Sequence, residues 1–229
     1  MRKPVVDYRQ FRLSKWNDPT FSHVKLLLGW VGYFVMYILT ENLIPAERCT
    51  PVHCALDDKI PFCEIFLIPY VGWYLFVIGS LLYFFLYHVE NFKRLQIFII
   101  VTQVVAMAIY VIFPNRQDLR PLDLPRDNFL TQGVAFLYSF DTNTGVCPSL
   151  HCAYSIGITS IFLKEKQVGW WVKTGVIVFT VLVCLSTMFI KQHSFLDFLA
   201  ALPVCLLAEI IACGGYWKTY RTKRQSAAG

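Results

Sequence analysis

Blocks of about 20 consecutive apolar residues recur along this chain, each with few or no charged side chains. A helix of that length spans the hydrocarbon core of a bilayer. Hydrophobic residues make up 56% of the 229 residues, more than the roughly 45–50% of a soluble domain. The sequence therefore predicts an all-α membrane protein whose single domain covers residues 1–229.

Six membrane spans are predicted, forming one bundle. They cover Leu26–Leu43, Phe66–Tyr87, Leu95–Phe113, Ala153–Leu163, Trp170–Ile190 and Phe195–Tyr216. The fourth block would rise only about 16 Å, against a hydrocarbon core of roughly 30 Å. We therefore expect this helix to begin earlier, near Pro148, because proline is well tolerated in a first helical turn.

Basic residues are unevenly divided between the two sets of connecting segments. With the N-terminus inside, 15 of the 21 Lys and Arg residues lie in inner segments and six in outer ones. Cytoplasmic segments collect Lys and Arg, and basic turns at 91–94 and 164–166 fit this orientation. Both termini are predicted to be cytoplasmic, with residues 1–24 as a retained N-terminal segment and 217–229 as a basic tail. We expect a multi-pass protein of the plasma (cytoplasmic) membrane.

The net charge of +6 follows from the same bias. Basic and aromatic residues do not alternate outside the apolar blocks, so the sequence does not indicate nucleic-acid binding. Long polar loops at 44–65 and 114–147 would face the outside. Loops of this length in a compact protein are often functional.

Three polar stretches meet at the predicted outer membrane face, where we expect the active site. They are Arg116–Pro121, Pro148–His151 and Lys191–Asp197. His193 and Asp197 are four residues apart at the start of the last span, a spacing that places both on one helix face. Asp197 can accept a hydrogen bond from one ring nitrogen, which leaves the other nucleophilic or basic. A pair that only caps the helix is the alternative.

The stretch from Pro148 to His151 opens the fourth helix. A helix N-terminus offers free backbone N–H groups to a phosphate. Ser149 can add a hydroxyl, and His151 can donate a proton to a leaving oxygen. An ordinary helix start with Ser149 as its cap is the alternative interpretation.

Fixed positive charge accompanies these groups in Arg120, Lys191 and Arg116. The planar guanidinium of Arg120 suits phosphate oxygens, whereas solvated loop charge explains Arg116 equally well. Phosphoryl transfer needs cationic contacts and a positioned nucleophile. The three stretches together supply both.

These residues resemble the motifs of the type 2 phosphatidic acid phosphatase superfamily, the acid phosphatase–chloroperoxidase fold. Its second motif, Pro-Ser-Gly-His, is matched by Pro148–His151 with Leu150 in place of Gly. Its third, Ser-Arg, five residues, His, three residues and Asp, is matched by Ser186–Asp197 with Thr187 in place of Arg. Of the first motif, Lys, six residues and Arg-Pro, only Arg120 and Pro121 match, and Phe113 stands at the Lys position.

The differences resemble the divergent branch that includes inositol phosphorylceramide synthases. Lys191 and Arg116 could replace the two missing cations. The resemblance implies a lipid phosphatase that hydrolyses a phosphomonoester or pyrophosphate through a phosphohistidine on His193. Asp197 would orient His193 and His151 would protonate the leaving alcohol, with no metal or other cofactor. The residues expected to bind the substrate are Arg120, Lys191, Ser149, Arg116 and Leu150.

Two other functions stay open. A head-group phosphotransferase would use a lipid hydroxyl instead of water as the final acceptor. A noncatalytic transporter could share the fold, although the intact set of His151, His193 and Asp197 argues against it. The expected partners are a lipid phosphate and the bilayer. The particular lipid and the oligomeric state stay open.

Five cysteines fall on the predicted outer side, where disulfides can persist. They are Cys49, Cys54, Cys63, Cys147 and Cys152. A bridge among the first three and free thiols are both compatible with the sequence. A zinc site with His53 is disfavoured, because no second ligand pair follows at metal spacing.

Four acidic residues remain ambiguous. Asp57, Asp58 and Glu64 in the first outer loop are interpreted as solvated, with recognition of a cationic or polyol head group as the alternative. Glu209 lies deep in the last span, where a carboxyl is a functional candidate. A bond to a neighbouring helix explains Glu209 as well.

Overall fold

A computed structural model describes residues 3–226, with side chains described as far as Thr219. The architecture is nearly all helical. The α-helices are α1 Leu28–Leu43, α2 Leu67–Tyr87, α3 Val89–Ile112, α4 Phe129–Phe140, α5 Leu150–Lys164, α6 Trp170–Phe189 and α7 Phe195–Ser226. Short 3-10 helices cover η1 Tyr8–Gln10, η2 Leu13–Lys15, η3 Ser22–Leu27, η4 Ala46–Arg48 and η5 Glu64–Phe66, and the strands are β1 Thr50–Pro51 and β2 Asn115–Arg116.

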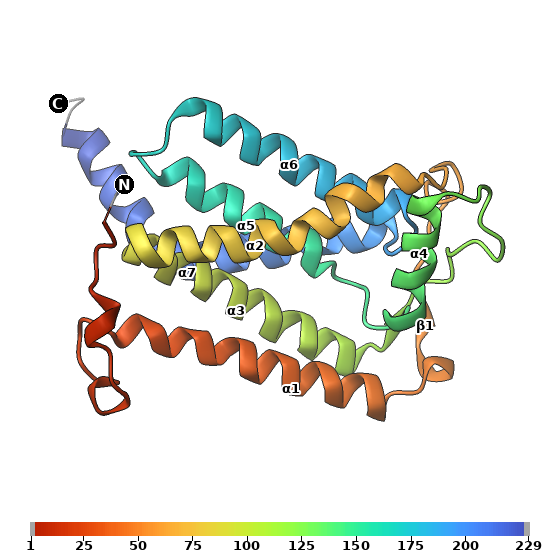
Figure 1. Ribbon diagram of the computed structural model, residues 1–229, viewed down its shortest axis with the longest axis horizontal. Helices are drawn as coiled ribbons and strands as arrows, with labels where there is room; N and C mark the ends of the chain where they lie inside the picture. Colours follow the sequence, from red (N-terminus) through yellow and green to blue (C-terminus); the bar gives the residue numbers. More distant parts are fainter. Residues whose placement is uncertain (1–2, 227–229) are drawn as a thin grey trace.

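The long helices lie side by side in one bundle (Figure 1). The two long loops, α4 and the short strands gather at one end, which we call the loop end. The N-terminal segment and the last turns of α7 lie at the opposite end. The predicted basic tail, 217–229, is helical as far as Ser226, and the side chains of Arg221, Lys223 and Arg224 lie outside the described residues, as do residues 1–2 and 227–229.

Five helical segments of the described chain are long and apolar enough to cross a membrane, as expected of an integral membrane protein. They are Ser22–Leu43, Glu64–Tyr87, Val89–Ile112, Trp170–Phe189 and Phe195–Thr219. The predicted fourth span corresponds to α5, which has 15 residues and is only about 22 Å long. Helix α5 packs against α2, α3, α6 and α7. Because its neighbours surround it, α5 need not match the thickness of the lipid.

Helix α3 begins earlier than predicted. The sequence predicts a basic turn at 91–94. In the structure, residues 91–94 lie in the first turns of α3, and only His88 separates α2 from α3. Asn91 is buried and donates a hydrogen bond to Glu165 Oε2 over 2.6 Å. His88 Nδ1 lies 3.0 Å from the same oxygen. Asn91 and His88 therefore bind Glu165 at the end of α5 instead of facing water.

Helix α4 was not predicted, because its segment lies within the expected outer loop 114–147. Asn128 caps it, accepting hydrogen bonds from the backbone of Leu130 and Thr131, while Thr131 Oγ1 accepts from Asn128 N. Val134 and Leu137 are buried against the start of α2. At 12 residues, α4 is too short to span a membrane and covers the loop end.

Two parallel strands join the long loops. Thr50 pairs with Asn115 and Pro51 with Arg116. Asn115 is fully buried, and its side-chain oxygen accepts hydrogen bonds from Val146 N and Cys147 N. This one side chain therefore fixes the path of the chain just before the stretch from Pro148 to His151.

The segment predicted as a polar tail, 1–24, folds back on the bundle over its described part. Val5 N donates to Leu86 O over 2.8 Å. Tyr8 stacks on Phe85, and its hydroxyl donates to Phe85 O over 2.7 Å. His23 is buried beside them. These contacts cover the α2–α3 turn.

Candidate active site

His193 lies in the turn between α6 and α7, and Asp197 lies in the first turn of α7. Their predicted contact is present, with His193 Nδ1 3.1 Å from Asp197 Oδ2. Two neighbouring backbone bonds fix the turn, from His193 N to Thr187 O and from Ser194 N to Asp197 Oδ2. With Nδ1 donating its proton to the carboxylate, Nε2 carries the free lone pair.

Both side chains are buried, Asp197 completely. Burial acts to lower the pKa of His193, but the hydrogen bond and the negative charge of Asp197 outweigh it, so the pKa lies above its ordinary value. An imidazolium that forms at His193 is therefore stabilised by a desolvated carboxylate.

His151 lies in the first turn of α5, with its ring centroid 5.5 Å from that of His193. Two aromatic rings of α2 hold it: Tyr70 stacks on it at 4.6 Å, and the Trp73 ring lies at 4.2 Å. His151 Nε2 is buried and has no hydrogen-bond partner among the described residues. Such a nitrogen is expected to meet a ligand or water.

The N-termini of α5 and α7 are joined directly. Ser149 N donates to Asp197 O over 3.1 Å, and Ser149 Oγ accepts from Cys152 N over 3.4 Å. Ser149 is thus the N-cap of α5, as the alternative interpretation held. Leu150 is the first residue of α5 and is buried. The backbone N–H groups of this first turn point out of the N-terminal end of α5, where the two histidine rings lie.

Arg120 holds the segment that follows α4 against the turn of His193. Its guanidinium donates to Asp141 O and Thr142 O, each over 2.9 Å, and to Gln192 Oε1 over 2.6 Å. Its charge also lies 4.6 Å from the centroid of the Tyr138 ring. Through Gln192, the residue before His193, Arg120 reaches the candidate site.

Lys191 and Arg116 are directed elsewhere. The ammonium of Lys191 donates to Asp57 O over 3.0 Å and to Ile60 O over 2.5 Å. The guanidinium of Arg116 donates to Asp118 and to Ala46 O. Both cations fasten the first outer loop. Of the three predicted cations, only Arg120 contacts a residue adjacent to the histidine.

The two positions without a cation differ in their surroundings. Thr187 is completely buried, and its hydroxyl donates to Cys184 O over 2.8 Å. Its carbonyl accepts from Gln192 N and His193 N, so Thr187 shapes the turn through its backbone. Phe113 follows α3 and is about half exposed, at 49%.

Asp141 was not among the predicted site residues. Its Oδ2 accepts hydrogen bonds from Gln192 Nε2 over 2.9 Å and from Tyr70 OH over 3.4 Å. Burial raises its pKa, against the opposing charges of Arg120 and His193. Asp141 therefore belongs to the wall of the site. Its position after α4 could not be inferred without α4 itself.

Asp57 and Glu64 correct the interpretation of the first-loop acids as solvated. Asp57 is 2% exposed and accepts from Ser194 Oγ over 2.6 Å, Phe195 N over 2.7 Å and Cys54 N over 2.8 Å. Burial acts to raise its pKa, but these hydrogen bonds outweigh it and the pKa lies below its ordinary value.

Glu64 is also buried and bonds Arg126 over 2.6 Å and Asn128 over 3.0 Å. Asp58 is exposed as predicted and pairs with His53. The first loop thus contributes two structural carboxylates, one to the start of α7 and one to the start of α4. Neither contact is visible in the sequence, because each joins residues more than 60 positions apart.

Replacing Asp57 with alanine is expected to destabilise the protein. The change removes the cap of α7 and leaves buried donors unpaired, at a cost of more than about 2 kcal/mol. For a chain of this size that corresponds to a fall in melting temperature of roughly 4–8 °C, measured by thermal unfolding in detergent. The neighbouring Asp58→Ala removes only an exposed pair and should change stability by less than about 0.5 kcal/mol. Equal effects of the two changes would contradict the capping role.

All eight cysteines are free thiols. Cys147 precedes the stretch from Pro148 to His151, and burial together with the charge of Asp197 raises its pKa to about 12. Cys152 lies below the site, with its sulfur 4.0 Å from Thr187 Oγ1. No group of three His, Cys, Asp or Glu side chains in residues 3–226 is arranged to hold a metal ion.

Glu209 of α7 is bonded to a neighbouring helix. Its carboxylate lies 2.7 Å from Lys164 Nζ and accepts from Ser160 Oγ over 2.7 Å. Trp217 Nε1 donates to it as well. Both partners in α5, Ser160 and Lys164, lie in the half of that helix away from the histidines. These bonds therefore join α5 to α7 and do not reach the candidate site.

Comparisons with models of protein families, with curated proteins and with solved structures find no match for this chain. The chemistry of the site is therefore argued from its own groups: a buried carboxylate–histidine pair, a second histidine with an unpartnered nitrogen, and a helix N-terminus beside them.

Proposed function

We propose that this protein hydrolyses a phosphomonoester or pyrophosphate carried on a lipid. The observation that carries the proposal is the pairing of His193 with the buried Asp197 while the His151 ring lies 5.5 Å from it. One histidine is thereby prepared as a nucleophile and the other as a proton donor. This division of roles is what phosphoryl transfer through a covalent intermediate requires.

In the first step His193 Nε2 attacks phosphorus, and the bond between phosphorus and the leaving oxygen breaks. Protonated His151 gives its proton to that oxygen, and Asp197 stabilises the positive charge on the phosphorylated ring. In the second step His151, now neutral, takes a proton from water as the water oxygen bonds to phosphorus. The P–N bond breaks, and inorganic phosphate leaves with both histidines restored.

Negative charge on the phosphoryl oxygens needs donors that do not reorganise during the reaction. The first-turn N–H groups of α5 are suited to this, since a helix N-terminus favours an anion. Arg120 contributes positive charge at longer range, through its bond to Gln192. We propose that Lys191 and Arg116 act only through the loops that they fasten.

We further propose that α5 completes a six-span bundle with both termini in the cytoplasm. The loop end, and with it the histidine pair, would then face the outside of the plasma membrane. The uneven distribution of Lys and Arg supports this orientation. A lipid phosphate in the outer leaflet presents its phosphate at the depth of this site.

The test is a panel of lipid phosphates presented to the purified protein in detergent. Phosphatidic acid, a polyprenyl pyrophosphate and a sphingoid phosphate are each scored for inorganic phosphate, with and without a polyol. Release of inorganic phosphate without an acceptor is the expected result. Product that forms only with the acceptor would replace the phosphatase with the phosphotransferase. No phosphoryl transfer from any lipid would refute both.

The orientation is tested by labelling from one side of the membrane. Leu122 is fully exposed in the second long loop, and Lys166 is exposed in the α5–α6 turn at the other end. In a variant without native cysteines, Leu122→Cys should react with a membrane-impermeant maleimide in intact cells. Lys166→Cys, the matched control, should react only after the membrane is opened. The reverse pattern would place the site in the cytoplasm.

A further inference from the structure

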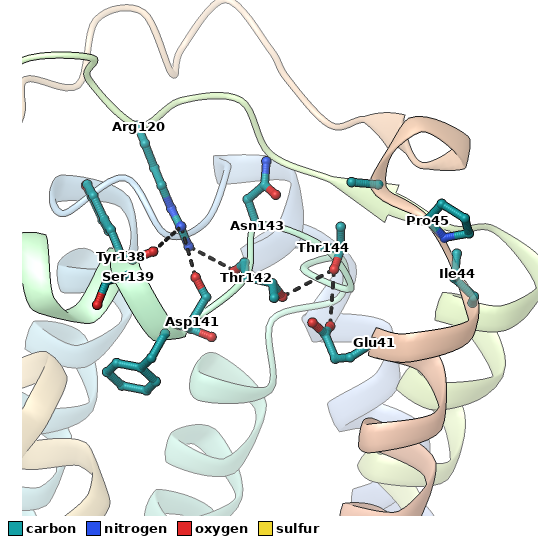
Figure 2. A pocket seen from close by; sticks show the side chains of 12 residues that line it. Glu41, Ile44, Pro45, Arg120, Tyr138, Ser139, Asp141, Thr142, Asn143 and Thr144 are labelled. Atoms are coloured by element: carbon teal, nitrogen blue, oxygen red, sulfur yellow. Dashed lines mark hydrogen bonds between the residues drawn. The ribbon is translucent and has the colours of Figure 1, made fainter.

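A cavity of about 330 Å³ opens at the loop end, between the end of α1 and the end of α4 (Figure 2). Glu41, Ile44 and Pro45 form one side, and the segment from Tyr138 to Thr144 forms the other. Its volume lies at the lower end of the range for small-molecule sites, about 300–1,000 Å³. It suits one polar group of modest size and not a whole lipid.

The cavity shares a wall with the candidate active site. Asp141 and Arg120 line it, and both are hydrogen-bonded to the side chain of Gln192. Gln192 directly precedes His193. The hydroxyl of Tyr70, whose ring stacks on His151, reaches the same Asp141 oxygen. Asp141, Gln192 and Tyr70 therefore connect the cavity with the two histidines.

Among the polar groups of the lining, hydrogen-bond acceptors outnumber free donors. Arg120 is its only cation among the described residues, and both of its terminal nitrogens already donate to acceptors of the protein. Glu41 accepts one bond, from Thr144 Oγ1 over 3.1 Å, which leaves acceptor capacity on a carboxylate. A phosphate would meet two carboxylates here, Glu41 and Asp141, against the single guanidinium of Arg120. The lining therefore selects against an anion.

The remaining polar groups of the lining can accept hydrogen bonds from hydroxyls. Thr144 Oγ1 donates to Glu41 and Ser139 Oγ donates to Phe136 O over 2.7 Å, so both hydroxyls are left to accept from the O–H groups of an alcohol. The Asn143 amide nitrogen donates to Gln117 O over 2.8 Å, so its oxygen is left to accept.

We propose that this cavity binds a hydroxyl-rich group, with Glu41 accepting from its hydroxyls beside Asp141. The inference rests on the proposed function, since the cavity is joined to the histidine pair through Asp141 and Gln192. Two sources share this chemistry. One is a free polyol that competes with water for the phosphohistidine, and the other is a polyol head group on the lipid itself.

Binding is measured on His193→Ala protein in detergent, so that no turnover interferes. Glycerol, glucose and inositol are the free probes in saturation-transfer NMR, and phosphatidylglycerol is the lipid-borne probe. We expect at least one of these to bind, and Glu41→Gln to weaken its binding about tenfold or more, as the loss of a hydrogen bond to a charged group implies. Thr144→Val, which removes the hydroxyl that donates to Glu41, should also weaken it.

Glu47→Gln is the matched control, because Glu47 is an exposed carboxylate in η4, six residues beyond Glu41 and outside the cavity lining. It should leave binding unchanged. Binding of a free polyol would support a soluble source, and binding of phosphatidylglycerol alone would support the head group. The proposal is overturned if no polyol binds, if Glu41→Gln and Thr144→Val both leave binding intact, or if ethanolamine or inorganic phosphate binds instead.

Failure of this inference can be told apart from failure of the proposed function. Phosphate release by the unmodified protein without polyol binding would leave the phosphatase standing and remove the cavity's role. Polyol binding without any phosphoryl transfer would do the opposite.

Discussion

Replacing His193 with alanine is expected to abolish turnover of a lipid phosphate and, with it, the covalent intermediate. The change removes the only protein atom that bonds to phosphorus in the proposed mechanism. The rate should therefore fall by more than about 10⁴, beyond what the loss of general acid–base catalysis costs. Brief incubation with a ³²P-labelled substrate should trap an acid-labile, base-stable phosphoprotein in the unmodified protein and none in the variant.

The matched control is His53→Ala, since His53 is an exposed histidine of the first loop that pairs with Asp58. It should trap the label as the unmodified protein does. The melting temperature of both variants shows whether the fold survives. Residual turnover of His193→Ala above about a hundredth of the original rate would mean that histidine is not the nucleophile, because acid–base effects alone account for a loss of that size.

Features that depend on local sequence could be predicted. Hydropathy places the long helices, because a run of apolar side chains has few alternatives to a membrane helix. The spacing of His193 and Asp197 predicts their contact, since four residues make one helical turn. The structure places His193 just before α7 instead of within it, yet the separation still allows the bond.

Features that depend on distant partners could not be predicted. Lys191 lies two residues before His193, and proximity in sequence suggested a shared role. Its φ of 55° belongs to a turn in which neighbouring side chains diverge, and its ammonium meets carbonyls of the first loop instead. In the sequence, Asp57 resembles a solvated loop acid. In the structure, the first loop folds over the start of α7 and Asp57 is buried there.

Helix α4 combines a local sequence signal with contacts to distant residues. Its capping pattern, Asn128 with Thr131, is visible in the sequence, but the surrounding loop is polar and rich in proline, which masks a 12-residue helix. The end of α4 places Asp141 beside Gln192 and forms one side of the cavity. Because α4 was not predicted, this wall of the site was not predicted either.

His151 is held in place without a hydrogen bond to its Nε2. The stacked ring of Tyr70 and the tilted ring of Trp73 determine its orientation, which leaves the nitrogen free to exchange a proton. Substitution by alanine would leave a hole between these rings. Phenylalanine keeps the aromatic contact and removes only the proton exchange, so His151→Phe is the sharper variant.

His151→Phe is expected to lower turnover of an alkyl phosphate by about 10²–10⁴, the usual contribution of a general acid or base. The two steps should respond differently to the leaving group. With p-nitrophenyl phosphate, whose leaving group needs no proton, the first step should stay fast and release about one equivalent of p-nitrophenol per protein. Hydrolysis of the phosphohistidine then lacks its base, so the phosphorylated protein should accumulate and the steady state should be slow. Rapid-mixing absorbance measurements with ³²P trapping follow both events.

If p-nitrophenol appears without a burst, at the same reduced rate as the alkyl product, His151 does not act on the leaving group. Its place between Tyr70 and Trp73 would then be structural.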